Sequence, residues 1–140
     1  QRSLVGSEMC IRDSRYAVEK GVKSVTIYGG LGGRLDHTIA NLQALRWLAE
    51  HGVWAELLSE NNRACLQFPG TRQYLRRAGW NFSLFALTEQ CILTTTGVQY
   101  PLTHGTLQAN FPLGISNSIL QESASVTVEE GILLVIASRD

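Results

Sequence analysis

The sequence contains no long apolar run, no cysteine pair at metal-binding spacing and no excess of charge of either sign. Its longest strongly apolar run, Ile132 to Ala137, is far too short to cross a bilayer, and no signal-peptide pattern opens the chain. Twelve basic and twelve acidic residues cancel to a net charge of zero, which argues against non-specific binding to nucleic acid or to an anionic membrane surface. We therefore expect no nucleic-acid partner and no membrane attachment.

The three cysteines, Cys10, Cys65 and Cys91, are odd in number, and none stands in a CxxC pair. Such spacing argues against a disulfide scaffold or a zinc site and makes a reducing cytosol the default compartment. With 140 residues and 44% hydrophobic content, the chain can bury an apolar core without disulfides. These features predict a soluble cytoplasmic protein.

The first residues resemble foreign sequence. The chain does not begin with methionine, and residues 1–14, QRSLVGSEMCIRDS, show neither helical nor strand periodicity. The stretch resembles translated adapter sequence at the broken ends of genes assembled from environmental DNA, and a floppy native terminus is the alternative. We expect residues 1–14 to be a non-native leader and the chain to be the C-terminal part of a longer protein.

Residues 15–69 alternate between helical and strand-like patterns. A helix is predicted to end at Gly21, and a second helix to run from Asp36 to about His51 with Gly52 after it. Strands are predicted at 23–28, 53–59 and 63–68. Alternation of helices and strands is typical of an α/β domain with a parallel sheet.

From Pro69 onward the pattern changes to short strands separated by turns. The strand-like runs are NFSLFAL, CILTTTGVQY, TLQANF, ASVTVEE and ILLVIAS. Several short strands at this spacing predict a small antiparallel sandwich or barrel. We place a domain boundary here, with a partial α/β domain at 15–69 and an all-β sandwich domain at 70–140.

Four of the five residues from Gly29 to Gly33 are glycines, and they lie between a predicted strand and a predicted helix. Such a loop can bind an anion, because free amide N–H groups and the positive end of the helix dipole face the ligand. It is not a Walker A loop, since Arg34 and Leu35 follow Gly33 where GK[ST] is required. A GxGxxG dinucleotide fingerprint is also incomplete, because its third glycine would fall at Leu35. Glu60 could still serve as a ribose-binding acid, which keeps NAD binding open as an alternative.

Three polar residues follow the loop. Arg34 offers a planar fork of donors suited to phosphate oxygens, with a solvated surface role as the alternative. Asp36 is a magnesium ligand, a helix N-cap or both. His37 lies in the first helical turn, where a structural role is commoner than a catalytic one. His51 and His104 show no spacing that suggests a metal site.

In the all-β part, the stretch PLGISNS places Ser116 and Asn117 side by side. Such a pair can bind a polar heterocycle or make a turn, and the local chemistry by itself favours the turn.

Taken together, these stretches resemble bacterial thiamine pyrophosphokinase, also called thiamine diphosphokinase. The resemblance rests on GGLGGRLDHTIANL, LLSENN, SLFALTEQ, GVQYPL, FPLGISNS and VTVEEGILLVI, which occur in the family's order between Arg15 and the end of the chain. It implies an α/β nucleotide-binding domain with a partial three-layer architecture, then a β-sandwich that helps bind thiamine, in a homodimer. It also implies transfer of a diphosphoryl group from ATP to thiamine, releasing AMP, with Mg²⁺ as cofactor.

The resemblance implies roles for individual residues. Those expected to bind the nucleotide are Gly29, Gly30, Gly32, Gly33, Arg34 and His37. Arg34 and Asp36 are expected to be catalytic, with Asp36 assisting the metal. Ser116 and Asn117 are expected to face the thiamine ring and to serve the nucleotide domain of the partner subunit.

The sequence also departs from the family. The family's GDxDS-like and D-x-T-D-like stretches, whose carboxylates hold magnesium, do not occur in it. We therefore expect the 140-residue polypeptide to be nearly inactive. Two alternatives stay open at this point, a non-catalytic nucleotide-binding module and an NAD-dependent oxidoreductase fragment.

Overall fold

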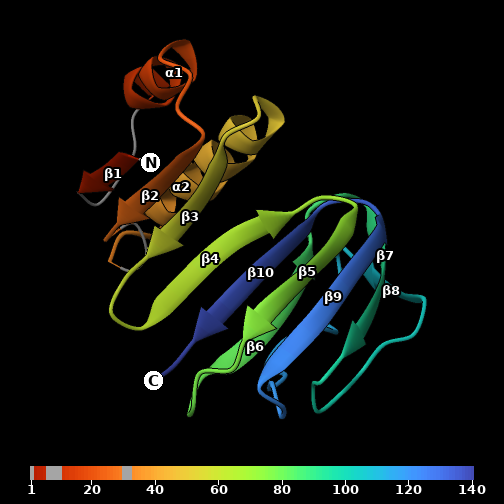
Figure 1. Ribbon diagram of the computed structural model, residues 1–140. Coiled ribbons are helices and arrows are strands. Elements are labelled where there is room, and N and C mark those ends of the chain that lie inside the picture. Colours follow the sequence, from red (N-terminus) through yellow and green to blue (C-terminus); the bar gives the residue numbers. More distant parts are fainter. Residues whose placement is uncertain (1, 6–10, 30–32) are drawn as a thin grey trace. The chain divides into compact units, whose positions relative to one another are not determined.

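A computed structural model describes residues 2–5, 11–29 and 33–140 of the chain. These residues form two helices and ten strands, so the described chain is mostly β. They divide into two compact units, Gln1–Leu66 and Gln67–Asp140, and each unit is described by itself (Figure 1).

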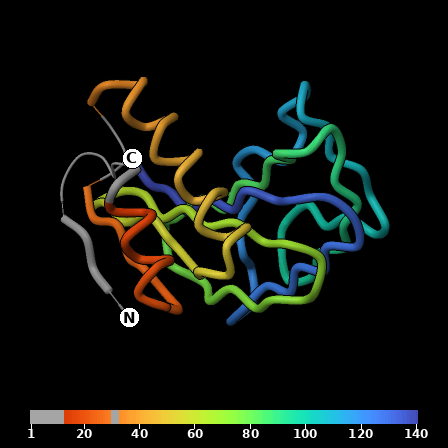
Figure 2. The backbone as a smooth tube through the Cα atoms, turned by 90° about the horizontal axis from the view of Figure 1, so that it is seen from above, coloured from red at the N-terminus to blue at the C-terminus, as the bar shows by residue number. Residues whose placement is uncertain are grey.

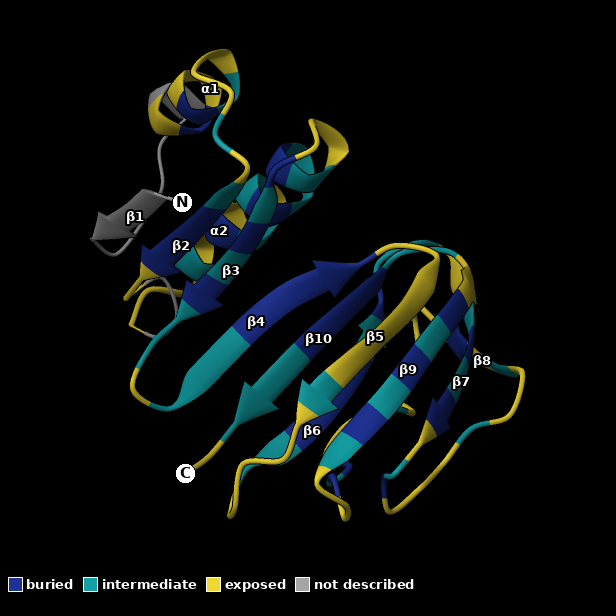
Figure 3. Cartoon of the chain, viewed as in Figure 1, coloured by how far each residue is buried: buried dark blue, intermediate teal, exposed yellow. Residues whose placement is uncertain are grey.

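The first unit combines parallel strands with two helices. Its elements in chain order are β1 (Arg2–Val5), α1 (Ile11–Glu19), β2 (Ser24–Tyr28), α2 (Leu35–Glu50), β3 (Trp54–Leu58) and β4 (Asn62–Gln67). β2 pairs in parallel with β1 and with β3, whereas β3 and β4 form an antiparallel hairpin. Three successive residues of β2, 25–27, are buried, and because successive side chains point to opposite faces, the sheet is covered on both faces here (Figure 3).

The position of α2 agrees with the sequence pattern to within one residue at each end. The helix is uninterrupted (Figure 2), and it buries Asn41, Leu45 and Leu48 while leaving Leu35 and Ile39 exposed. Within the described ranges, no helix is both long and apolar enough to cross a membrane.

Residues 1–14 show no periodic pattern, yet part of this stretch forms regular secondary structure. β1 pairs with β2 through residues 2–5, and α1 begins at Ile11. Ladder hydrogen bonds join backbone groups, so a strand can form at this position without an alternating side-chain pattern. Residues 1 and 6–10 lie outside the described part of the chain.

The second unit is made of antiparallel strands. They are β5 (Gly70–Leu75), β6 (Asn81–Ala86), β7 (Gln90–Thr96), β8 (Gly105–Gln108), β9 (Ser123–Glu130) and β10 (Leu133–Ser138). Four of them form a sheet in the order β5-β9-β7-β8, and β6 pairs with β10. The Tyr74 ring of β5 lies 5.4 Å from the Phe82 ring of β6, so side chains of the two antiparallel groups are in contact.

Alternation explains why these residues form strands. β9 buries Ala124, Val126 and Val128 and turns the residues between them outward, and β7 alternates in the same way. The sequence pattern predicted five of the six strands in this unit but not β5. Its sequence, GTRQYL, has no apolar alternation, because it is an edge strand with most of its side chains exposed.

The fold class predicted from the sequence is therefore confirmed only in part. The chain is mostly β-sheet with few helices, and its all-β region is where the sequence placed it. Nothing in the fold by itself shows that residues 15–69 form a nucleotide-binding domain.

Candidate functional site

The glycine-rich loop between β2 and α2 is bounded by two glycines in the left-handed region. Gly29 has a φ of 74° and Gly33 a φ of 71°, a conformation that residues with a Cβ atom rarely adopt. The Gly29 amide donates a 2.8 Å hydrogen bond to the carbonyl of Leu58, which ties the start of the loop to the end of β3. The other two glycines of the expected phosphate cradle, Gly30 and Gly32, lie outside the described residues.

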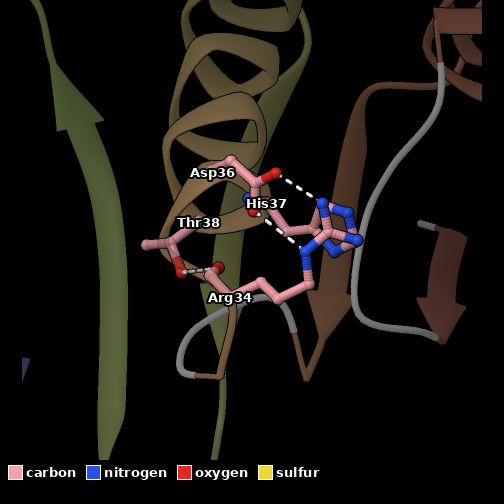
Figure 4. Close-up of polar contacts among 4 residues, drawn as sticks. All are labelled: Arg34, Asp36, His37 and Thr38. Carbon is pink, nitrogen blue, oxygen red and sulfur yellow. Dashed lines mark hydrogen bonds and ion pairs between the residues drawn. The ribbon is translucent and has the colours of Figure 1, made fainter.

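Arg34 and Asp36 form a paired contact at the N-terminal end of α2 (Figure 4). Arg34 Nε donates to Asp36 Oδ1 at 3.2 Å, and Arg34 Nη2 donates to Asp36 Oδ2 at 2.5 Å. Both side chains are largely exposed, at 68% and 63%. A guanidinium carries more N–H donors than one carboxylate can accept, so this pair leaves Arg34 donors for a further anion.

The structure corrects one interpretation of Asp36. Arg34 occupies the N-cap position of α2, with φ −74° and ψ 123° and no side-chain cap hydrogen bond. Asp36 lies inside the first turn, where its Oδ1 accepts a 3.0 Å bond from the His37 amide. The N-cap interpretation is therefore wrong, because α2 begins at Leu35.

The hydrogen bond from Arg34 is the main reason that the pKa of Asp36 lies below its ordinary value of 3.8. Its carboxylate is therefore ionised at neutral pH, the form in which carboxylates bind metal ions. However, no group of three or more histidine, cysteine, aspartate or glutamate side chains in the described ranges could hold a metal ion.

The remaining histidines have structural partners. The His51 ring stacks on Trp47 with centroids 4.0 Å apart, and its Nδ1 lies 2.7 Å from the Trp47 carbonyl. His104 pairs with Glu129 on the surface of the second unit. His37 is half-buried in the first turn of α2, beside Thr38, whose hydroxyl donates to the Arg34 carbonyl (Figure 4).

The second unit brings Asn117 and Tyr100 together. Asn117 Oδ1 accepts hydrogen bonds from the amides of Tyr100 and Ser118 at 3.0 and 2.9 Å, and Asn117 Nδ2 donates to the Tyr100 carbonyl at 3.0 Å. Only 7% of Asn117 is exposed, whereas Tyr100 is 64% exposed. Tyr100 was not predicted from the sequence to be a site residue. Tyr100 belongs to the motif GVQYPL, which could have drawn attention to it. No local pattern, however, indicates its hydrogen bonds to Asn117, 17 positions away.

Ser116 differs from its neighbour, because its side chain is exposed. Its φ of 58° lies in the left-handed region, and its hydroxyl has no hydrogen-bond partner within the described part of the chain. Large apolar side chains on the same loop are also exposed, namely Phe111, Leu113 and Ile115. The loop thus combines one exposed hydroxyl with exposed apolar side chains. Of the two residues expected to contact thiamine, Ser116 is exposed to solvent and Asn117 is buried.

The chain is similar to known thiamine pyrophosphokinases. Residues 72–133 match the family model described as thiamin pyrophosphokinase, vitamin B1 binding domain. The chain is 28% identical over 127 residues to the thiamine pyrophosphokinase of Bacillus subtilis (strain 168), covering 89% of this chain and 59% of that protein.

Solved structures of thiamine pyrophosphokinases are similar to this chain as well. The crystal structure of thiamine pyrophosphokinase from Bacillus subtilis superposes with a TM-score of 0.84 at 28% identity, covering 90% of this chain and 60% of that one. That of thiamin pyrophosphokinase from Geobacillus thermodenitrificans superposes with a TM-score of 0.79 at 32% identity, covering 90% and 59%. The chain thus spans about three-fifths of the length of these relatives.

The matched region places the second unit in the class of thiamin pyrophosphokinase domains named for vitamin B1 binding. The resemblance in sequence and the likeness in structure both extend through the first unit as well, and together with the family-model match they support the thiamine pyrophosphokinase family for this chain.

Proposed function

We propose that this chain is part of a thiamine diphosphokinase, which transfers a diphosphoryl group from ATP to thiamine and releases AMP. The observation that carries the proposal is the Arg34 guanidinium beside Gly33 at the N-terminal end of α2. Helix N-termini and guanidinium groups both favour phosphate. Diphosphoryl transfer depends on positioning and on neutralising phosphate charge more than on covalent catalysis.

In this proposal the first unit binds the nucleotide. The loop from Gly29 to Gly33 approaches the ATP phosphates, and His37 lies at the same helix end. Arg34 contributes the donors that its pair with Asp36 leaves over, and they stabilise charge on the transferring group. The first unit would then be the C-terminal part of an α/β nucleotide-binding domain.

The second unit supplies the thiamine contact. Ser116 offers an exposed hydroxyl among apolar side chains, which suits a ring that carries polar groups. Asn117 contributes by holding Tyr100 and Ser118 in place, and its buried amide stands at the edge of the same site. As the resemblance implies a homodimer, Ser116 and Asn117 would serve the nucleotide domain of the partner subunit.

Mg²⁺ accompanies ATP in the proposed reaction. The carboxylate expected to assist it, that of Asp36, is already paired with Arg34. That donor set does not by itself make a magnesium site, since the ion also requires phosphate oxygens and usually a second carboxylate. We therefore assign no step of the reaction to the metal. Because the family's two acidic motifs do not occur in the sequence, we propose that these 140 residues alone are nearly inactive. We also propose a cytoplasmic location, since Cys65 and Cys91 are free thiols.

The proposal is tested by calorimetric titration of the 140-residue chain with thiamine, together with AMP release by the full natural protein given ATP, thiamine and Mg²⁺. We expect thiamine to bind and AMP to form in step with thiamine diphosphate. A protein that is stabilised by nucleotide but releases no AMP would instead be a non-catalytic module. Stabilisation by NAD in preference to ATP, with no response to thiamine, would indicate an oxidoreductase, which none of the relatives described above supports.

A further inference from the structure

The loop that carries Ser116 is attached to one edge of β6. On its other edge, β6 pairs with β10 from Asn81 to Ala86. On the loop side, the Phe82 amide donates to the carbonyl of Asn117 at 2.8 Å, and the Leu84 amide donates to the carbonyl of Gly114 at 3.0 Å. Two backbone hydrogen bonds therefore hold the ends of the segment 114–117 against the strand.

Between these two bonds the loop is held by a side chain. Backbone groups of successive strand residues point to opposite edges, so those of Ser83 point toward β10, where it is paired with Ile136. Within the described part of the chain, the Ser116 amide makes no hydrogen bond to the backbone of β6. It donates instead to Ser83 Oγ at 2.9 Å, and Ser83 is only 5% exposed.

The backbone conformation of Ser116 is an uncommon one. Ser116 has a φ of 58°, which costs a residue with a Cβ atom conformational free energy. The segment also lies very close to β6, because a Cβ atom added at Gly114 would come within 2.3 Å of the Leu84 carbonyl oxygen. A left-handed residue in such a tight segment persists only when its surroundings determine it, and here the Ser83 hydroxyl accepts the hydrogen bond of the Ser116 amide.

We propose that Ser83 is a positioning residue for thiamine binding. Its hydroxyl holds the Ser116 backbone in the left-handed conformation, and this directs the exposed Ser116 hydroxyl toward a polar heterocycle such as the thiamine pyrimidine. Ser83 is buried and acts through Ser116 without touching the ligand. The inference rests on the proposed function, and its test separates the two.

The first measurement requires no ligand. Amide hydrogen exchange at Ser116 is compared among the wild-type 140-residue chain, Ser83→Ala and Ser83→Thr, which restores a hydroxyl. We expect exchange at Ser116 to accelerate about tenfold in Ser83→Ala, the scale of one lost hydrogen bond, and to return toward wild type in Ser83→Thr. Unchanged exchange in Ser83→Ala would show that the bond does not hold the loop and would overturn the proposal.

The second measurement is thiamine affinity in a double-mutant cycle. Ser83→Ala and Ser116→Ala are each expected to weaken binding about tenfold, and the double variant to bind no worse than Ser116→Ala. Ser125→Ala, a half-buried strand serine of β9, is the matched control and should bind as wild type. Losses that add in the double variant would show that Ser83 does not act through Ser116.

The outcomes separate the inference from the function on which it rests. A wild-type chain that binds no thiamine would overturn the proposed function and the positioning role with it, while the exchange measurement would still decide whether the bond holds the loop. Binding by the wild type with full affinity retained in Ser83→Ala would overturn the positioning role alone.

Discussion

Arg34 and Asp36 stand two residues apart and face each other across the first turn of α2, joined by two hydrogen bonds between the guanidinium and the carboxylate. The pair lies on the surface beside the glycine-rich loop, where ion pairs contribute little to stability. A well-oriented but weakly stabilising pair at a helix N-terminus is consistent with a role in binding, and the first two predictions concern it.

Substitution of either partner should reduce catalysis much more than stability. In the full natural protein, Arg34→Ala and Asp36→Asn are each expected to lower kcat/KM by roughly 10²-fold or more, the scale of one lost charge contact in the transition state. AMP release measures the effect, and the thermal midpoint should hardly change. Arg46→Ala, which breaks the exposed pair with Glu50 on the same helix, is the control. Wild-type turnover in Arg34→Ala would show that Arg34 is a solvated surface residue without a role in catalysis.

The pKa of Asp36 should depend on Arg34. Its folded pKa lies below the ordinary 3.8 because the guanidinium favours the charged form. The pair therefore stabilises the fold above that ordinary pKa, and the contribution is lost as pH falls through the lowered folded value. Carbon NMR of the Asp36 carboxyl across an acid titration should show the low pKa in wild type and a return toward 3.8 in Arg34→Ala. Equal pKa values in both proteins would contradict the assigned cause.

The neighbours Asn117 and Ser116 should respond differently to truncation. Asn117→Ala removes the three hydrogen bonds of a buried side chain, two of them to the backbone of Tyr100 and one to that of Ser118, so we expect a loss of about 1–3 kcal/mol in the free energy of unfolding. Ser116→Ala removes an exposed hydroxyl and should change that free energy by less than about 0.5 kcal/mol, while weakening thiamine binding. Denaturant unfolding measures both, and equal losses would contradict the division of roles.

Gly114 should not tolerate a side chain. An added Cβ atom would meet the Leu84 carbonyl oxygen at 2.3 Å, so Gly114→Ala must push the segment 114–117 away from β6. Gly79→Ala is the comparison, since Gly79 has a φ of +81° but nothing within 4 Å of an added Cβ. We expect about 1–2 kcal/mol of destabilisation at Gly79 from the backbone conformation alone and a larger loss at Gly114. A smaller loss at Gly114 would mean that the segment shifts freely.

Cys91 should make the fold sensitive to alkaline pH. Burial, with a smaller contribution from Glu130, raises the pKa of this thiol to about 11 from an ordinary 9.0. Between these values the unfolded chain loses the proton while the folded chain keeps it, so stability falls as pH rises through this window. The difference in unfolding free energy between wild type and Cys91→Ala isolates this effect from other titrating groups. A difference that is constant with pH would contradict it.

The helices and most strands could be predicted from the sequence because their signals are local. Leu45 and Leu48 recur at helical spacing in α2, and the alternation of Ala124, Val126 and Val128 marks β9. β5 was not predicted because an edge strand depends on backbone hydrogen bonds more than on apolar side chains. The N-cap of α2 is Arg34, whereas Asp36 lies in the first turn and pairs with Arg34, a side-chain geometry that residue types alone do not specify.

The sequence by itself determined the order of the elements, the glycine-rich loop, the polar residues that follow it and the family resemblance. Only the tertiary structure decided that Asn117 is buried against Tyr100, and that Ser116 is held by a hydroxyl 33 positions earlier in the chain. Periodicity reflects contacts within a few residues, which the local chain dictates. Hydrogen bonds between distant residues form only after folding has brought their segments together. The sequence around one partner therefore does not predict the contact with the other.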